Sequence, residues 1–218
     1  MCLDRAGLVG EDGPTHHGAF DMSYMRCIPN LIIASPMNEH YLRHLMFTAY
    51  KENSPFVIRY PRGQGVIPDW KCDLQQITIG KGRKLRDGNE IALLTIGPIG
   101  NDVAEAINIL KTENMSIAHY DMIFLKPIDT ALLKEVVNDY ERVITVEEGT
   151  INGGFGSAVS EFLAENKIRH IKLSHIGLPD EFITHGTVAD LKRKYKLDVT
   201  GLTDTIRSIV YNADYKYS

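Results

Sequence analysis

The sequence predicts an α/β protein in which strands alternate with helices along the chain. Short apolar runs of strand length are followed by segments whose apolar residues recur every three or four positions. This alternation is typical of mostly parallel sheets with helices on both faces. The expected strands are 31–35, 56–60, 91–96, 117–121, 142–147 and 169–174, and the expected helices begin near 39 and 99 and span 130–138, 156–165, 187–195 and 202–212.

Asn38 marks the start of the helix between the first two strands, because it is a residue type favoured just before a first helical turn. Leu42, Leu45, Met46 and Ala49 then fall on one face at helical spacing. With a strand on either side, this helix predicts a parallel βαβ unit.

A linker separates this unit from a second alternation of strands and helices. Residues 66–78 contain Pro68, Trp70 and scattered charges, which suits neither a helix nor a strand. We therefore expect a first domain over 1–65 and a second over 79–218.

The composition excludes several classes of protein. The chain has 218 residues, a formal net charge of -4 and 44% hydrophobic residues, enough for a core without disulfides or metal. No basic stripe suggests nucleic-acid binding, and no apolar run approaches the ~20 residues of a membrane helix. No basic and apolar leader precedes a cleavage site, so we expect a cytoplasmic protein.

The three cysteines, Cys2, Cys27 and Cys72, match no zinc or redox spacing. We expect two of them to be small buried hydrophobic residues and the third to lie near the linker.

The first loop, residues 5–18, concentrates polar side chains between glycines. Loops at strand ends are where α/β sheets place ligand sites. Arg5 offers a planar cationic fork suited to phosphate, and a histidine titrating near ~6.5 passes protons at neutral pH. The adjacent pair His16–His17 disfavours a metal site, since neighbouring side chains rarely converge on one ion. The alternative is a surface loop with solvated charges.

Arg59 and Arg62 end the second strand within the segment RYPRG. Alternation along a strand places them on opposite faces. Arg62 lies beyond the strand in a Pro–Gly loop, where a ligand could approach, and as a pair with Arg5 it would make a two-pronged phosphate clamp. The alternative for Arg62 is an ordinary salt bridge.

A glycine-rich turn follows Glu147 and Glu148 and leads into a helix. Backbone N–H groups at such a turn suit an anion. The turn lacks the lysine of a phosphate-binding P-loop, and two acids beside it repel phosphate. We favour tight packing between strand and helix.

Two further patterns receive no chemical role. His40 and His44 stand one helical turn apart, but without a nearby general base they indicate a solvated helix face. Residues 177–186 indicate a loop that packs on another subunit or domain.

Four separated motifs together resemble one family. DRAGLVGEDGPTHHGAFDMSYMRCIPN at 4–30, RYPRG at 59–63, EEGTINGGFGSAV at 147–159 and GLPDEFITHG at 177–186 are similar to the C-terminal portion of the 1-deoxy-D-xylulose-5-phosphate synthase family, in the transketolase superfamily. The resemblance extends from about residue 2 to residue 212.

The resemblance implies a partial transketolase-type pyrimidine-binding α/β domain followed by a transketolase C-terminal α/β domain. The family condenses pyruvate with D-glyceraldehyde 3-phosphate, with loss of carbon dioxide, for isoprenoid and thiamine precursors. It uses thiamine diphosphate and Mg²⁺ and is generally a homodimer. By position, Arg5 and Arg62 match residues that hold the aldehyde's phosphate. Asp12 and His16 match residues at its reacting end, with His16 as proton donor or oxyanion stabiliser.

The chain also departs from that family. Nothing in it resembles the cofactor-binding domain with its magnesium ligands, or the glutamate that activates the aminopyrimidine. We therefore expect no cofactor or metal site here, and an isolated chain that neither binds thiamine diphosphate tightly nor turns over. We also expect residues 1–62 to be less ordered than the rest, or to pair with another chain. Alternatives are the β-type subunit of a split thiamine-dependent enzyme and a non-catalytic interaction module.

Overall fold

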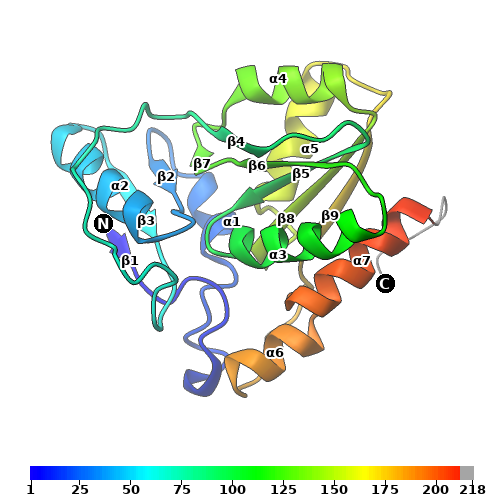
Figure 1. The fold of residues 1–218 in the computed structure, drawn as a ribbon. Helices are drawn as coiled ribbons and strands as arrows, with labels where there is room; N and C mark the ends of the chain where they lie inside the picture. The colour runs from blue at the N-terminus through cyan, green and yellow to red at the C-terminus, as the bar shows by residue number, and fades with distance from the viewer. Residues whose placement is uncertain (212–218) are drawn as a thin grey trace.

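The computed structural model describes residues 1–211, which form two sheets with helices around them (Figure 1). A four-stranded sheet has the order β1-β3-β2-β7, and a five-stranded sheet has the order β4-β6-β5-β8-β9. Within residues 1–211, no helix combines the length and apolar character needed to cross a membrane. The elements are β1 (Cys2–Leu3), η1 (Gly10–Asp12), α1 (Asp21–Arg26), β2 (Ile32–Ala34), α2 (Glu39–Lys51), β3 (Phe56–Arg59), β4 (Arg83–Arg86), β5 (Ile91–Ile96), α3 (Ile99–Thr112), β6 (Ile117–Asp121), β7 (Phe124–Lys126), α4 (Thr130–Asp139), β8 (Arg142–Thr150), α5 (Phe155–Glu165), β9 (Lys172–Leu178), α6 (Val188–Lys194) and α7 (Val199–Tyr211).

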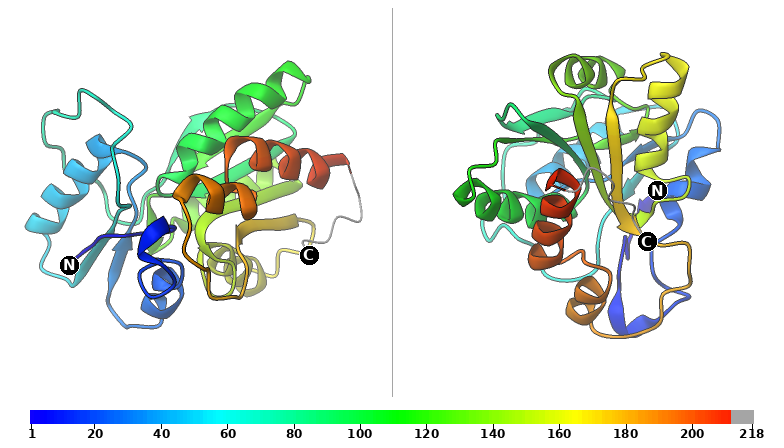
Figure 2. Two further views of the ribbon diagram at one scale, coloured as in Figure 1. Left: turned by 90° about the horizontal axis from the view of Figure 1, so that it is seen from below. Right: turned by 90° about the vertical axis from the view of Figure 1, so that its right-hand side faces the viewer.

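The five-stranded sheet is parallel except for its edge strand β4. Every residue of β5 is buried, and alternation sends Ile91 and Leu93 to one face and Ala92 and Leu94 to the other. Helices α3, α6 and α7 pack on the first face, and α1, α4 and α5 on the second (Figures 1 and 2). The predicted α/β fold with a mostly parallel sheet is confirmed.

The four-stranded sheet is completed by a strand from much later in the chain. Strands β1, β3 and β2 are parallel, and β7 adds to β2 in the antiparallel sense, with Ile33 opposite Lys126. The rings of Phe56 and Phe124 meet edge to face, 6.3 Å between centroids. Residues on both sides of the predicted linker therefore share one sheet and one hydrophobic cluster.

Most predicted elements are present with small shifts, and Asn38 caps α2 by accepting a hydrogen bond from the Tyr41 N–H at 3.1 Å. The last strand was misplaced: it spans Lys172–Leu178 instead of 169–174, since its pairing with β8 runs on to Leu178. Helix α7 begins at Val199, three residues earlier than expected, and residue 212 of that prediction lies outside the described residues.

The segment 66–78 packs along α2. The side chain of His40 hydrogen-bonds the Asp69 carbonyl at 2.8 Å, and the Gln75 N–H donates to His44 Nδ1 at 3.3 Å. Both histidines are half-buried, so the face that was expected to be solvated is partly covered by this segment.

The expectation of two buried cysteines was also wrong. Cys2 lies exposed on the two-residue edge strand β1, and Cys27 is exposed just after α1, where its thiol reaches the Tyr24 carbonyl at 3.0 Å. Cys72 is half-buried within the segment on α2.

Candidate active site

The loop of residues 5–18 is closed at its base by its own backbone. The Gly18 N–H donates to the Arg5 carbonyl at 3.0 Å, and the Gly7 N–H donates to the Gly18 carbonyl at 3.1 Å. A Cβ at Gly18 would lie 2.4 Å from the Arg5 carbonyl oxygen, so only glycine fits there. Arg5 has a φ of 60°, a left-handed backbone that is uncommon for residues other than glycine. Such strain is typical of functional loops.

Three of the four predicted site residues meet around one oxygen atom. Arg5 Nε donates to Asp12 Oδ2 at 3.1 Å, and Arg62 Nη1 donates to the same oxygen. The side chains of Arg5 and Arg62 are 38% and 54% exposed, so a dissolved ligand reaches both guanidinium groups. The hydrogen bond from Arg62, and after it the bond from Arg5, holds the pKa of Asp12 below its ordinary value.

The fourth predicted residue, His16, stands apart from this cluster. Its Nδ1 lies 3.0 Å from the Thr15 hydroxyl, and the side chain is exposed. Among residues 1–211, no hydrogen bond or ion pair joins His16 to Arg5, Asp12 or Arg62. Among the hydrogen bonds of residues 1–211, none involves His16 Nε2.

The neighbouring His17 has a structural role. It is buried, its Nδ1 accepts from the Val9 N–H at 3.0 Å, and its Nε2 lies 3.3 Å from the Thr184 carbonyl. Nδ1 is thus an acceptor, so Nε2 carries the proton and donates to Thr184. His17 ties the first loop to a loop from the far end of the chain.

That far loop lies between β9 and α6 and packs directly on the first loop. The Gly186 N–H donates to the Gly10 carbonyl at 3.3 Å, and the rings of Phe20 and Phe182 meet edge to face at 5.7 Å. Residues 177–186 were expected to form a loop that packs on another subunit or domain; residues 177–178 instead end β9, and the rest packs on the first loop of the same chain.

Arg59 and Arg62 face different surroundings; β3 ends at Arg59, so the loop beyond the strand places Arg62, and strand alternation does not apply to it. Arg59 is 2% exposed; its Nε donates to Asp21 Oδ1 at 2.7 Å, and its Nη2 donates to the carbonyls of Gly18 and Glu148, both at 2.7 Å. Arg59 therefore anchors the end of the first loop, while the side chain of Arg62 is exposed.

Glu148, for which sequence reasoning found no role, holds the start of the same loop. Its Oε1 accepts from the Leu8 N–H at 2.8 Å, and its Oε2 lies 3.5 Å from Lys192 Nζ. No local pattern distinguishes it from Glu147, since only the tertiary fold brings β8 against residues 7–8.

Glu147 itself occupies the N-terminus of α5. It accepts from the backbone N–H groups of Phe155 and Gly156, each at 2.8 Å. Burial raises the pKa of Glu147 to about 7, although these two hydrogen bonds oppose the shift. The carboxylate takes the place an external anion would need, so the glycine-rich turn serves packing, as predicted.

A cavity of about 450 Å³ opens beside the cluster. Its lining includes Arg62, Leu8, Glu148 and Lys192, so it reaches from Arg62 to helix α6. Its size suits a small ligand, and its lining comes mainly from loops and helix ends, with Glu148 as the residue from a strand.

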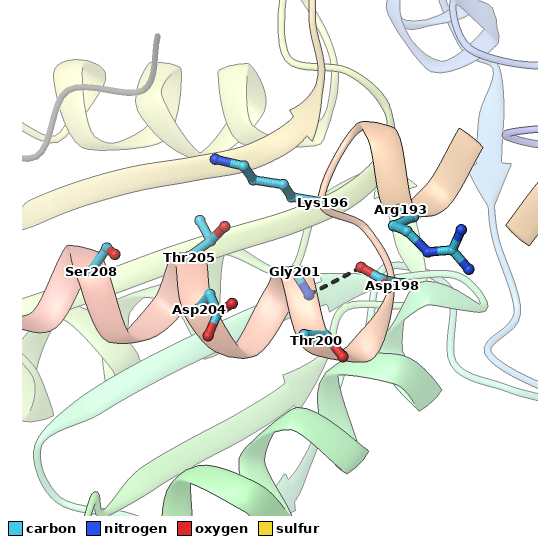
Figure 3. Close-up of a pocket in the computed structure, with 8 residues that line it drawn as sticks. All are labelled: Arg193, Lys196, Asp198, Thr200, Gly201, Asp204, Thr205 and Ser208. Carbon is cyan, nitrogen blue, oxygen red and sulfur yellow. Dashed lines mark hydrogen bonds between the residues drawn. The ribbon is translucent and has the colours of Figure 1, made fainter. Parts of the chain in front are cut away.

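A second hollow, of about 340 Å³, follows the outer face of α7 (Figure 3). Its lining holds two cations and two carboxylates, and Asp198 accepts the Gly201 N–H at 3.0 Å at the start of the helix. We assign no function to this hollow. Its lining is Arg193, Lys196, Asp198, Thr200, Gly201, Asp204, Thr205 and Ser208.

Comparison with known proteins shows the family and the fold of the chain. The family model of the transketolase C-terminal domain matches residues 80–202, and that of the transketolase pyrimidine-binding domain matches residues 1–66. The 1-deoxy-D-xylulose-5-phosphate synthase of Bacteroides thetaiotaomicron is 58% identical over 205 residues, 93% of this chain and 32% of that protein. The synthase of Halothermothrix orenii is 41% identical over 210 residues, 96% of this chain and 33% of that protein. The chain thus spans about a third of the length of these curated relatives.

Two solved structures share the fold. One, titled a split gene transketolase, inactive beta4 tetramer, superposes with a TM-score of 0.80 at 26% identity, over 95% of this chain and 64% of that one. Transketolase from Campylobacter jejuni superposes with a TM-score of 0.68 at 18% identity, over 95% of this chain and 31% of that one. From its sequence motifs, its two matched domains and its fold, the chain belongs to the transketolase family.

Proposed function

We propose that this chain supplies the aldehyde-phosphate site of a 1-deoxy-D-xylulose-5-phosphate synthase. That enzyme joins pyruvate to D-glyceraldehyde 3-phosphate with loss of carbon dioxide, and its product serves isoprenoid and thiamine precursor synthesis. One observation carries the proposal: Arg5 and Arg62, from separate segments, both donate to a single oxygen of Asp12. A phosphate oxygen binds two guanidinium groups in the same way.

In this proposal Asp12 occupies the clamp until substrate arrives. The phosphate takes the place of its carboxylate between Arg5 and Arg62, and Asp12 then accepts hydrogen bonds from the substrate hydroxyls. His16 acts at the reacting end, where it donates a proton to the aldehyde oxygen as that oxygen becomes a hydroxyl. Its exposure on the same loop supports this role.

The family implies thiamine diphosphate, which would supply the electron sink for decarboxylation, and Mg²⁺, which would bind its diphosphate. A magnesium ion bound to a diphosphate needs carboxylate or amide oxygens grouped around it. Over residues 1–211, no group of three or more His, Cys, Asp or Glu side chains is placed to hold a metal ion. The described residues therefore do not fit the magnesium site, and the steps above involve only the aldehyde.

Titration of the chain with D-glyceraldehyde 3-phosphate, followed by NMR of backbone and arginine side-chain N–H groups, tests the proposal. We expect Arg5→Met and Arg62→Met each to weaken binding about tenfold, as expected for loss of one charge-assisted hydrogen bond. Arg169→Met, at an exposed arginine away from the loop, is the matched control. Equal affinities in all three variants and the unaltered chain would refute the clamp.

We further propose that the full-length enzyme is a cytoplasmic homodimer, which the family resemblance supports. Light scattering of the full-length enzyme after size-exclusion chromatography tests the assembly: a dimer mass is expected, while a monomer or a tetramer contradicts it.

A further inference from the structure

We propose that Glu148 and Lys192 form a positioning pair that holds the first loop in the shape the phosphate clamp requires. The inference rests on the proposed function, because it explains how the clamp between Arg5 and Arg62 is kept in place. Neither residue touches the clamp; both act through the backbone of residues 7–8.

Glu148 fits closely against the start of the loop. Its Oε1 accepts the Leu8 N–H at 2.8 Å, and a Cβ on Gly7 would lie 2.3 Å from the same oxygen. The Glu148 carbonyl accepts from Arg59 Nη2 at 2.7 Å, and Arg59 also holds the Gly18 carbonyl. Both ends of the loop are thus bound to one short segment of β8.

Lys192 fixes the direction in which the Glu148 carboxylate points. Its Nζ lies 3.5 Å from Glu148 Oε2 and 2.7 Å from Asp102 Oδ2. Burial disfavours the charged lysine, but the carboxylates of Glu148 and Asp102 outweigh burial and raise its pKa. The charged lysine on α6 therefore forms ion pairs with both Asp102 on α3 and Glu148, and Glu148 in turn binds the first loop.

The arrangement has a direct consequence for the clamp. Arg5 lies just before the residues that Glu148 holds, and Asp12 lies four positions after Leu8. Without Lys192, the Glu148 carboxylate is free to turn towards water in the adjoining cavity, which both residues line. Leu8 then loses its partner, and Arg5 and Asp12 lose their fixed distance from Arg62.

The test compares Lys192→Met and Lys192→Arg in the 218-residue chain, with Lys194→Met as the control on the same helix. D-Glyceraldehyde 3-phosphate is titrated by NMR, and amide exchange is measured at Leu8 and throughout β5. For Lys192→Met we expect binding about tenfold weaker and faster exchange at Leu8, with β5 unchanged. Lys192→Arg should restore most of both, and Lys194→Met should alter neither.

Two results would overturn the inference. The first is unchanged affinity and unchanged Leu8 exchange in Lys192→Met. The second is an equal rise in exchange at Leu8 and in β5, which would show a general loss of stability. Should Lys192→Met fail to fold, Glu148→Gln serves instead, because it keeps an acceptor for Leu8 but loses the attraction to Lys192. If the unaltered chain does not bind the aldehyde at Arg5 and Arg62, the proposed function fails, while Leu8 exchange still decides the positioning role.

Discussion

Arg59 and Asp21 form an ion pair inside the protein, with Arg59 Nε 2.7 Å from Asp21 Oδ1 and side chains only 2% and 4% exposed. Removing one partner of a buried pair leaves the other charge without compensation, which costs about 3–5 kcal/mol. We expect Arg59→Met to lower the free energy of unfolding by that amount in urea denaturation. Arg62→Met, at the exposed end of the same motif, should change it by less than about 0.5 kcal/mol. Similar losses in the two variants would contradict the assignment of Arg59 as the structural arginine.

Asp12 is predicted to compete with phosphate for the clamp. Asp12→Ala removes the carboxylate that both arginines bind, so inorganic phosphate should bind the variant more tightly than the unaltered chain. Isothermal titration with inorganic phosphate measures this. Glu11→Ala, which removes an exposed carboxylate next to Asp12, controls for the change in net charge. Weaker phosphate binding in Asp12→Ala would show that the carboxylate does not stand in for a ligand.

Gly154 should not tolerate a side chain. A Cβ there would lie 2.2 Å from Glu147 Oε2 and 2.4 Å from the Thr150 carbonyl oxygen, and the backbone atom has no room to move. We expect Gly154→Ala to destabilise the protein by about 1–3 kcal/mol, the usual cost of overpacking. In Gly186→Ala the nearest atom is Leu191 Cδ2 at 3.4 Å, so that variant should unfold near the urea midpoint of the unaltered chain.

His119 should make the fold sensitive to acid. Burial, and after it the charges of Arg86 and Arg83, lowers its pKa from 6.5 to about 4, and its Nε2 lies 2.9 Å from the Thr95 hydroxyl. Between these two pH values the unfolded chain binds a proton that the folded chain does not. The stabilising contribution is therefore complete above pH 6.5 and lost as pH falls towards 4, by roughly 3 kcal/mol.

Two buried acids act in the opposite direction over much of this range. Burial raises the pKa of Glu147 to about 7 and of Asp121 to about 6, so each favours the folded state at low pH. The measurement is thus the difference in unfolding free energy between the unaltered chain and His119→Gln, taken across pH 4 to 7. A difference that does not vary with pH would show that His119 is not neutral in the fold.

The first sheet is predicted to open more readily than the second. Strand β1 has two residues and pairs on one side only, whereas β5 is wholly buried and paired on both sides. In hydrogen exchange we expect amides of β1 to exchange first, those of β3 next and those of β5 last. Equal protection in β3 and β5 would show that the two sheets open together.

Local patterns predicted the elements that carry a clear signal. Asn38 correctly predicted the start of α2, and the apolar run Ile91–Ile96 predicted both ends of β5. Strand β4 was missed because its sequence, RKLR, has too few apolar residues to show alternation; it is a charged edge strand in which Arg83 pairs with Asp121. Strand β7 was missed because its partner β2 is distant in sequence.

The same division holds for the site. Residue types predicted a phosphate clamp, and the fold brings Arg5, Asp12 and Arg62 together. His17 is buried and His16 is exposed, and two adjacent histidines in a sequence give no sign of which one will be buried. The link from Glu148 to Lys192 depends on how β8 and α6 approach the loop, so no spacing in the sequence reveals it.

Strand β7 also bears on what would happen if the chain were cut. A break in the backbone within 66–78 separates the polypeptide into two pieces, but the shorter piece still needs β7 to complete its sheet. The buried Arg59 in the shorter piece would likewise still donate a hydrogen bond to the Glu148 carbonyl in the longer piece. Two polypeptides made from a gene interrupted at this point should therefore find each other and rebuild one particle without a covalent connection.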